Sequence, residues 1–196
     1  AIRNSDQFKT HKDLTKGLRS FDLQSLKDRG QKLAFWINIY NTAVIHGVIG
    51  LGLKHSVKEV YNFFDRVVYE IGGYRFSLND MEHGILRGNR RPPYRLLRPW
   101  GKNDSRLEFA ILPIDPRIHF ALVCGARSCP PIGFYEAKQI DYQLQLASES
   151  FINSPQVRIL GGILWAPDFK DTDKDGVPDY KDKCPTQPED KDGFQD

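Results

Sequence analysis

The chain has 196 residues, of which 40% are hydrophobic, and its 28 basic and 25 acidic residues give a net charge of +3. This size supports one hydrophobic core with a small appendage. No apolar run reaches the length of a membrane-spanning helix, so we expect no transmembrane segment in this chain.

Charge divides the chain unevenly. Residues 168–196 hold ten acids and five lysines, a net charge of −5, so the preceding residues carry +8. Five arginines between Arg87 and Arg98 could suggest a nucleic-acid partner. This stretch lacks a helix-turn-helix, zinc-finger or RNA-binding signature. We therefore interpret it as a basic surface loop and expect no nucleic acid.

The N-terminal region is predicted to be helical. Residues 1–29 have amphipathic spacing, and residues 31–49 have hardly any polar face, which predicts a central, buried helix. Asn38, Thr42 and His46 lie four residues apart on one stripe of this helix. Buried polar side chains need hydrogen-bond partners. These three either fasten neighbouring loops or form the floor of a site, and for each one singly we favour fastening.

A β-hairpin follows this helix. Residues 67–71 and 74–78 alternate in polarity around Gly72-Gly73, which is a two-residue turn signal. Asn79, with Glu82 three residues later, predicts a capped short helix that ends near Gly88. Residues 89–106 are rich in proline and arginine and predict a long loop that could cover a site.

The rest of the body is predicted to mix strands and a helix. Residues 118–124 form an apolar run typical of a strand, and residues 134–151 have helical spacing. A second hairpin is predicted at residues 157–165, around Gly161-Gly162. The fold class predicted for residues 1–167 is therefore α+β, with helices packed on a mainly antiparallel sheet.

A group of thiol, imidazole and carboxylate side chains could support nucleophilic catalysis. Cys129 precedes a predicted helix, whose positive end would favour the thiolate, and Cys124 lies five residues earlier. A nearby imidazole would act as the base, and sequence spacing does not choose between His119 and His83. The group that orients the base or polarises the carbonyl could be Glu82 or Asn41, with His83 if His119 is the base.

Structural roles compete with this interpretation. Cys124 at the end of an apolar strand is more often a buried small hydrophobe than a nucleophile. Cys124 and Cys129 could also form a disulfide if their Cα atoms lie within about 7 Å, which would remove the nucleophile. The three cysteines are an odd number, consistent with one pair and one remaining thiol.

Residues 30–153 resemble the family named domain of unknown function 547. The motifs that carry this resemblance lie in the expected order at residues 32–41, 81–87 and 115–130. The family's motifs are similar to those of papain-like cysteine peptidases and related acyl-transfer enzymes, with a histidine opening a strand and a thiol at a helix start. The resemblance thus implies a papain-like fold with a rearranged chain order, because the early helix here carries Asn41 and no cysteine.

The C-terminal residues have the ligand spacing of a calcium loop. Counted from Asp171, carboxylates fall at positions 1, 3, 5, 9 and 12, with glycine at position 6 and a backbone carbonyl at position 7. A fragment of this pattern returns after Pro188. The predicted calcium ligands are Asp171, Asp173, Asp175, Val177, Asp179, Asp182, Asp190, Asp192 and Asp196. The competing interpretation is a solvated acidic tail.

Residues 171–185 resemble the thrombospondin type 3 repeat of outer-membrane and secreted bacterial proteins. The resemblance implies a repeat at residues 168–196 that wraps Ca²⁺ with little hydrophobic core. It also implies that Cys184 pairs with a cysteine of a neighbouring repeat. Because the chain ends inside the second unit, we expect it to be a piece of a longer protein.

Two functions follow as expectations. The first is an exported calcium-binding protein whose body is a cysteine-dependent hydrolase or acyl transferase, with a peptide or acyl substrate whose identity the sequence does not reveal. The second is a non-catalytic extracellular binding domain on a calcium-stiffened spacer. Both place the protein in the periplasm, at the outer membrane or outside the cell, with a partner on the cell envelope or surface. Millimolar calcium outside the cell favours this location.

Overall fold

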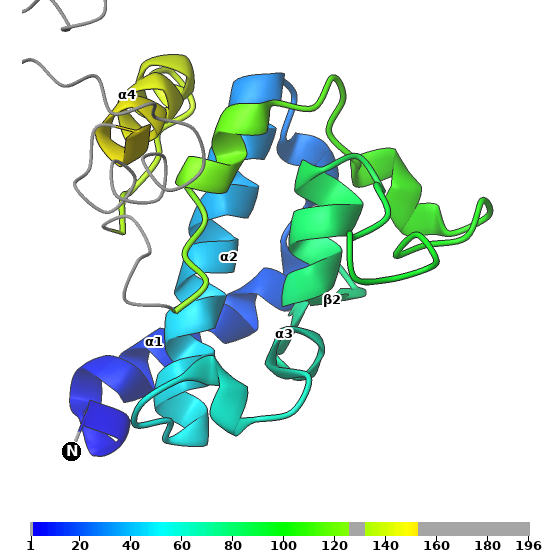
Figure 1. The fold of residues 1–196 in the computed structure, drawn as a ribbon. Helices are drawn as coiled ribbons and strands as arrows, with labels where there is room; N and C mark the ends of the chain where they lie inside the picture. The colour runs from blue at the N-terminus through cyan, green and yellow to red at the C-terminus, as the bar shows by residue number, and fades with distance from the viewer. Residues whose placement is uncertain (1, 126–131, 153–196) are drawn as a thin grey trace, which may run out of the picture. The chain divides into compact units, whose positions relative to one another are not determined.

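The computed structural model describes residues 2–125 and 132–152, which form a helix-rich α+β body with one small antiparallel sheet (Figure 1). This compact unit runs to Phe151. The predicted boundary at residue 167, the second hairpin and the calcium loop lie outside the described residues.

The helix α2, Arg29–Leu51, is the centre of the body, as its sequence predicts (Figure 1). Asp28 accepts a hydrogen bond from the Gln31 backbone, and the Gln31 side chain accepts from the Asp28 backbone, which forms a capping box. Gly52 ends the helix at φ 70°, a left-handed conformation that glycine adopts without a steric cost. The side chains that α2 buries on both sides include Leu33, Trp36, Ile37, Tyr40, Ala43 and Val44.

This helix also bears on the expectation about membrane segments. By length and composition alone, α2 is long and apolar enough to span a bilayer, although we identified no apolar run of that length in the sequence. Half of its apolar window is buried inside the protein. Its position in the core of the body explains that composition.

Short elements precede α2 where one longer helical region was predicted. They are η1 (Ile2–Asn4), α1 (Asp6–Lys16), η2 (Gly17–Ser20) and η3 (Leu23–Ser25). Side chains such as Ser5 and Asp22 cap these elements by accepting backbone N–H bonds. Phe8 and Leu23 are buried, and Phe21 stacks on Phe35 of α2 with ring centroids 4.7 Å apart.

The hairpin is confirmed. Two small elements, η4 (Val57–Glu59) and α3 (Phe63–Arg66), lead into β1 (Val68–Ile71), which pairs antiparallel with β2 (Tyr74–Ser77). Gly72 and Gly73 both have positive φ, as the two-residue turn requires. In the described residues these are the two strands present, so the sheet is antiparallel, as predicted, but smaller than we expected.

The predicted helix after the hairpin is present, but its cap differs. The element η5, Asp80–Leu86, is a π-helix, and the Asn79 side chain makes no capping bond. Asp80 Oδ2 instead accepts hydrogen bonds from the Ser77 backbone N–H and hydroxyl, at 2.9 and 2.8 Å. The side-chain amide of Asn79 is therefore available to bond Asp65 and Tyr94, which are distant in the sequence.

The predicted strand at residues 118–124 is absent. The element η6, Ser105–Phe109, leads to a 3₁₀ helix, η7, Pro116–Phe120. Asp115 caps η7 by accepting the Arg117 backbone N–H, and Pro116 occupies the first turn, where its missing N–H costs nothing. After η7, no neighbouring strand in the described residues supplies ladder bonds to residues 121–123.

Two asparagines of α2 supply backbone partners in place of a strand. Asn41 Nδ2 donates to the Ala121 carbonyl at 2.9 Å, and Asn41 Oδ1 accepts the Val123 N–H at 3.0 Å. Asn38 makes the same two-point contact with the backbone of Tyr135, at 2.8 and 2.9 Å. Each amide thus holds a segment that has no strand partner against α2. The fastening role favoured for this polar stripe is borne out for Asn38.

The last helix, α4 (Ile140–Ile152), begins later than the predicted residue 134. The Gln143 side chain accepts the Glu136 backbone N–H at 2.8 Å, which holds the preceding residues outside the helix. Ile140 and Leu144 join the hydrophobic core. A methyl group on Gly30 would lie 2.6 Å from the Ala137 carbonyl, so glycine permits the close approach of this segment to α2.

Replacing Asn41 by alanine should destabilise the body, because the Ala121 carbonyl and the Val123 N–H would lose their partners. Each unsatisfied buried group costs roughly 1–3 kcal/mol. Urea unfolding measures the loss, and Thr42→Ala, one residue along the same helix, is the matched control. Equal losses in the two variants would contradict the clamping role of Asn41.

Candidate functional site

His83 of η5 lies at the start of a chain of hydrogen bonds. The Arg87 guanidinium contacts His83 Nδ1 at 2.9 Å, and His83 Nε2 contacts the Tyr94 hydroxyl at 3.0 Å. Tyr94 donates to Asn79 Oδ1 at 2.8 Å, and Asn79 Nδ2 donates to Asp65 at 2.8 Å. Asp65 also pairs with Arg95. The chain therefore ties η5 to the loop after it.

The donors and acceptors in this chain select one tautomer of His83. A guanidinium only donates hydrogen bonds, so Nδ1 must accept and Nε2 must carry the proton. Burial, followed by the charge of Arg87, lowers the pKa of His83 to about 4. The imidazole is therefore neutral near pH 7, and both of its nitrogens are engaged. This arrangement suits a positioning role better than a general base.

Glu82 lies on the same element with its carboxylate partly buried. The Tyr40 hydroxyl donates to Glu82 Oε2 at 3.3 Å, and Arg87 approaches Glu82 Oε1 at 4.0 Å. Burial raises the pKa of Glu82, although Arg87 and the bond from Tyr40 act in the opposite direction. A partly buried carboxyl group of raised pKa can exchange a proton nearer neutral pH than an exposed one.

Among the described members of the predicted catalytic group, Cys124 and His119 are exposed. Burial and the negative charge of Glu82, and then that of the Cys124 thiolate, raise the pKa of Tyr40, so the thiol lies in the electrostatic neighbourhood of the Tyr40–Glu82 pair. Partial desolvation and the charge of Arg87 lower the pKa of His119. Its imidazole is thus neutral at pH 7 and open to solvent, which a proton acceptor needs.

The other predicted residues are placed differently. Asn41 uses both amide atoms on the backbone of residues 121–123, immediately before Cys124. Cys129 and the predicted calcium ligands between Asp171 and Asp196 lie outside the described residues. Among residues 2–125 and 132–152, no group of three side chains is arranged to hold a metal ion.

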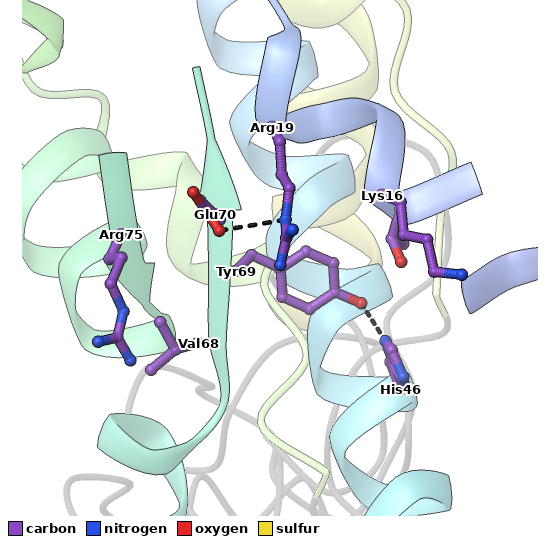
Figure 2. A pocket seen from close by; sticks show the side chains of 8 residues that line it. Lys16, Arg19, His46, Val68, Tyr69, Glu70 and Arg75 are labelled. Atoms are coloured by element: carbon purple, nitrogen blue, oxygen red, sulfur yellow. Dashed lines mark hydrogen bonds and ion pairs between the residues drawn. The ribbon is translucent and has the colours of Figure 1, made fainter. Parts of the chain in front are cut away.

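A separate groove of about 470 Å³ contains none of the predicted catalytic residues (Figure 2). Figure 2 shows His46 of α2 bonded to the Tyr69 hydroxyl of β1, and Arg19 of η2 paired with Glu70. Lys16 also lines this groove, but it pairs with Asp13 at 2.7 Å. Arg75 of β2 lines the groove as well and pairs with no carboxylate within the described residues, so the groove keeps one unpaired guanidinium group.

Sequence reasoning missed Tyr40, Tyr94 and Arg87 as partners of the η5 residues. Helical spacing could have indicated one of them, because Arg87 lies four residues after His83 and thus on the same face. Tyr40 and Tyr94 belong to distant segments, and no local pattern connects them to Glu82 or His83.

The pH dependence of stability tests the neutral state of His83. Its folded pKa of about 4 lies below the usual 6.5, so the unfolded chain binds a proton first as pH falls. The stabilisation is complete above pH 6.5 and should decline toward pH 4, by about 3 kcal/mol at most. His83→Gln keeps one acceptor and one donor but does not titrate, so it should lose less stability over this range.

Urea unfolding between pH 6.5 and 4 measures the difference. His55→Gln, at an exposed histidine, is the control and should follow the wild type. Parallel curves for the wild type and His83→Gln would show that His83 is not held neutral by the fold.

Comparison with known proteins gives one family. No curated protein and no solved structure matches the chain. The model of the family described as "Protein of unknown function, DUF547" matches residues 23–152, about two thirds of the sequence. The match spans every element from η3 to α4. It includes the candidate residues Glu82, His83, His119 and Cys124. The chain therefore belongs to the DUF547 family.

Proposed function

We propose that this is an exported calcium-binding protein whose DUF547 body is a cysteine-dependent hydrolase or acyl transferase acting on an amide or thioester bond. Cys129 is the proposed nucleophile, with Cys124 as the alternative, and His119 is the proposed base. The observation that supports this best is the neutral, exposed imidazole of His119 in a body where exposed Cys124 neighbours the Tyr40–Glu82 pair.

The surroundings of the thiol segment favour the proposal. Asn41 holds residues 121–123 against α2, so the backbone that leads to Cys124 is fixed. Rigid placement of reacting groups lowers the entropy that must be lost on reaching the transition state. Glu82, whose pKa is raised by burial, adds a carboxyl group that can orient the base or polarise the substrate carbonyl.

The proposed reaction has two halves. His119 accepts the thiol proton, and the thiolate attacks the carbonyl carbon to form a tetrahedral oxyanion. The amine or thiol leaving group departs with the proton from His119, and an acyl-enzyme remains. Water or an amine then attacks the acyl-enzyme while His119 takes its proton, and the restored thiol leaves as the acid or amide is released.

The likeness to papain-like enzymes remains part of this proposal. Papain-like enzymes place the cysteine helix before the histidine strand, and here α2 carries Asn41 and no cysteine. His119 lies in the 3₁₀ helix η7 and not at the start of a strand. A papain-like arrangement would therefore need both a permuted chain order and a different element to carry the base.

Thiol labelling tests the catalytic proposal. Iodoacetamide at neutral pH should modify Cys129 or Cys124 faster than it modifies free cysteine, and mass spectrometry of Cys124→Ser and Cys129→Ser identifies which. His119→Ala should slow this labelling by roughly tenfold or more, because the base that favours the thiolate is removed.

His55→Ala, at an exposed histidine, is the matched control and should label at the wild-type rate. If neither thiol reacts faster than free cysteine, the cysteine-dependent mechanism fails. The same measurement with and without reductant detects a Cys124–Cys129 disulfide, which would also exclude it.

A non-catalytic binding domain is the second candidate. It is favoured by the complete engagement of Asn41 and His83 in hydrogen bonds within the body, which leaves fewer groups for chemistry. On this alternative, the body binds a cell-envelope or surface partner and the C-terminal repeat acts as a calcium-stiffened spacer.

The calcium proposal depends on the donor set of residues 171–196. Five aspartates with loop spacing and a glycine at the turn supply hard oxygen ligands, which suit Ca²⁺. The thrombospondin type 3 assignment and the exported location belong to this part of the proposal. Export follows if the repeat fills at the calcium concentrations found outside cells.

Isothermal titration should show calcium uptake at millimolar concentration or below. Asp173→Ala or Asp175→Ala should weaken binding by roughly tenfold or more, because each removes a charged ligand. Glu189→Ala, an acid of the same region outside the ligand spacing, is the matched control. The calcium loop is excluded if the wild-type protein binds no calcium, or if the three variants bind calcium equally well.

A further inference from the structure

The loop between η5 and η6 presents a surface that combines apolar and basic side chains. We call it the arginine–leucine platform. Its residues surround a hollow of about 690 Å³ and are Gly88, Arg90, Arg91, Leu96, Leu97, Arg98, Leu112 and Ile114. The leucines are unusually open to solvent, with Leu96 87%, Leu97 79% and Leu112 66% exposed. Clustered apolar exposure of this kind marks interaction surfaces.

The loop is anchored at its base. Asn89 bonds the backbone of Trp100 in both directions, at 3.0 and 3.1 Å, and the Trp100 indole donates to Asp80 at 2.8 Å. Trp100 is buried against Gly84, where an added Cβ would lie 2.5 Å from its ring. The two ends of the loop are thus held together against η5.

The middle of the loop is anchored as well. The Tyr94 hydroxyl bonds both His83 and Asn79, and Arg95 pairs with Asp65 of α3. Leu96 and Leu97 follow directly and make no contribution to the hydrophobic core. A loop fixed on both sides of an exposed leucine pair pays little ordering entropy when those leucines are buried by a partner.

The charge of the platform is entirely positive. Residues 87–98 contain five arginines and no acid. Arg87 and Arg95 are used within the body, by His83 and Asp65. Within the described part of the chain, Arg90, Arg91 and Arg98 have no acidic side chain within ion-pairing distance. Three uncompensated guanidinium groups therefore surround the exposed leucines.

We propose that the platform docks on the surface of an anionic phospholipid bilayer. Transfer of leucine side chains from water to the boundary between headgroups and acyl chains is favourable in free energy. Guanidinium groups bind lipid phosphates at the same depth. Charge complementarity favours this occupant, because a bilayer offers many phosphates above an apolar layer, and the platform offers three guanidinium groups beside an apolar pair. A nucleic acid would match the arginines but would leave the leucines in water.

Co-sedimentation with lipid vesicles tests the proposal on the full chain. The protein should sediment with vesicles that contain phosphatidylglycerol and only weakly with pure phosphatidylcholine. Arg90→Gln, Arg91→Gln and Arg98→Gln together should weaken binding roughly a hundredfold, and added salt should also weaken it. Leu96→Ser with Leu97→Ser should weaken binding by roughly tenfold or more.

Matched controls separate the platform from charge and hydrophobicity in general. Lys12→Gln, Lys27→Gln and Lys58→Gln remove the same charge elsewhere, and Leu14→Ser with Leu146→Ser change exposed leucines on α1 and α4; both sets should bind as the wild type. Vesicle binding that is absent, equal in all charge variants or unchanged by the platform leucine variant would overturn the proposal. So would a nucleic acid that binds the platform in the same salt range while vesicles do not.

Discussion

The body depends on the backbone partners that α2 provides along its length. Asn38 and Asn41 each satisfy one N–H and one carbonyl of a segment that belongs to no sheet, and they do so from a helix that is otherwise almost wholly apolar. A buried backbone group without a partner is costly, so these amides allow residues 121–123 and Tyr135 to pack against the central helix in place of strands. The body therefore needs no further strands to satisfy the backbone groups of these segments.

A second constraint is the chain of hydrogen bonds that runs from His83 of η5 to Asp65 of α3. Neutral His83 joins Arg87 to Tyr94, and Tyr94 continues through Asn79 to Asp65. This chain leaves His83 without an open nitrogen and makes His119 the better candidate for a base. The same chain of hydrogen bonds holds the loop that carries Leu96 and Leu97.

The outcome of the sequence predictions follows from how local each signal is. The hairpin was predictable because alternating polarity and two glycines, which readily adopt the positive φ of the turn, specify it within residues 67–78. The prediction of a strand at residues 118–124 was wrong, because a short apolar run does not distinguish a strand from another buried segment. There Asp115 and Pro116 begin a 3₁₀ helix, and Asn41, far away in sequence, supplies the bonds that a strand neighbour would have made.

The sequence by itself determined the family, the buried central helix, the hairpin and the list of thiol, imidazole and carboxylate candidates, because each depends on composition or short-range spacing. Only the tertiary structure decided the tautomer of His83, the engagement of Asn41, the pairing of Tyr40 with Glu82 and the exposure of Leu96 and Leu97. Those properties depend on which distant groups share a low-dielectric interior and which remain in water. The spacing of residues along the sequence does not reveal which distant groups lie close together in the folded protein.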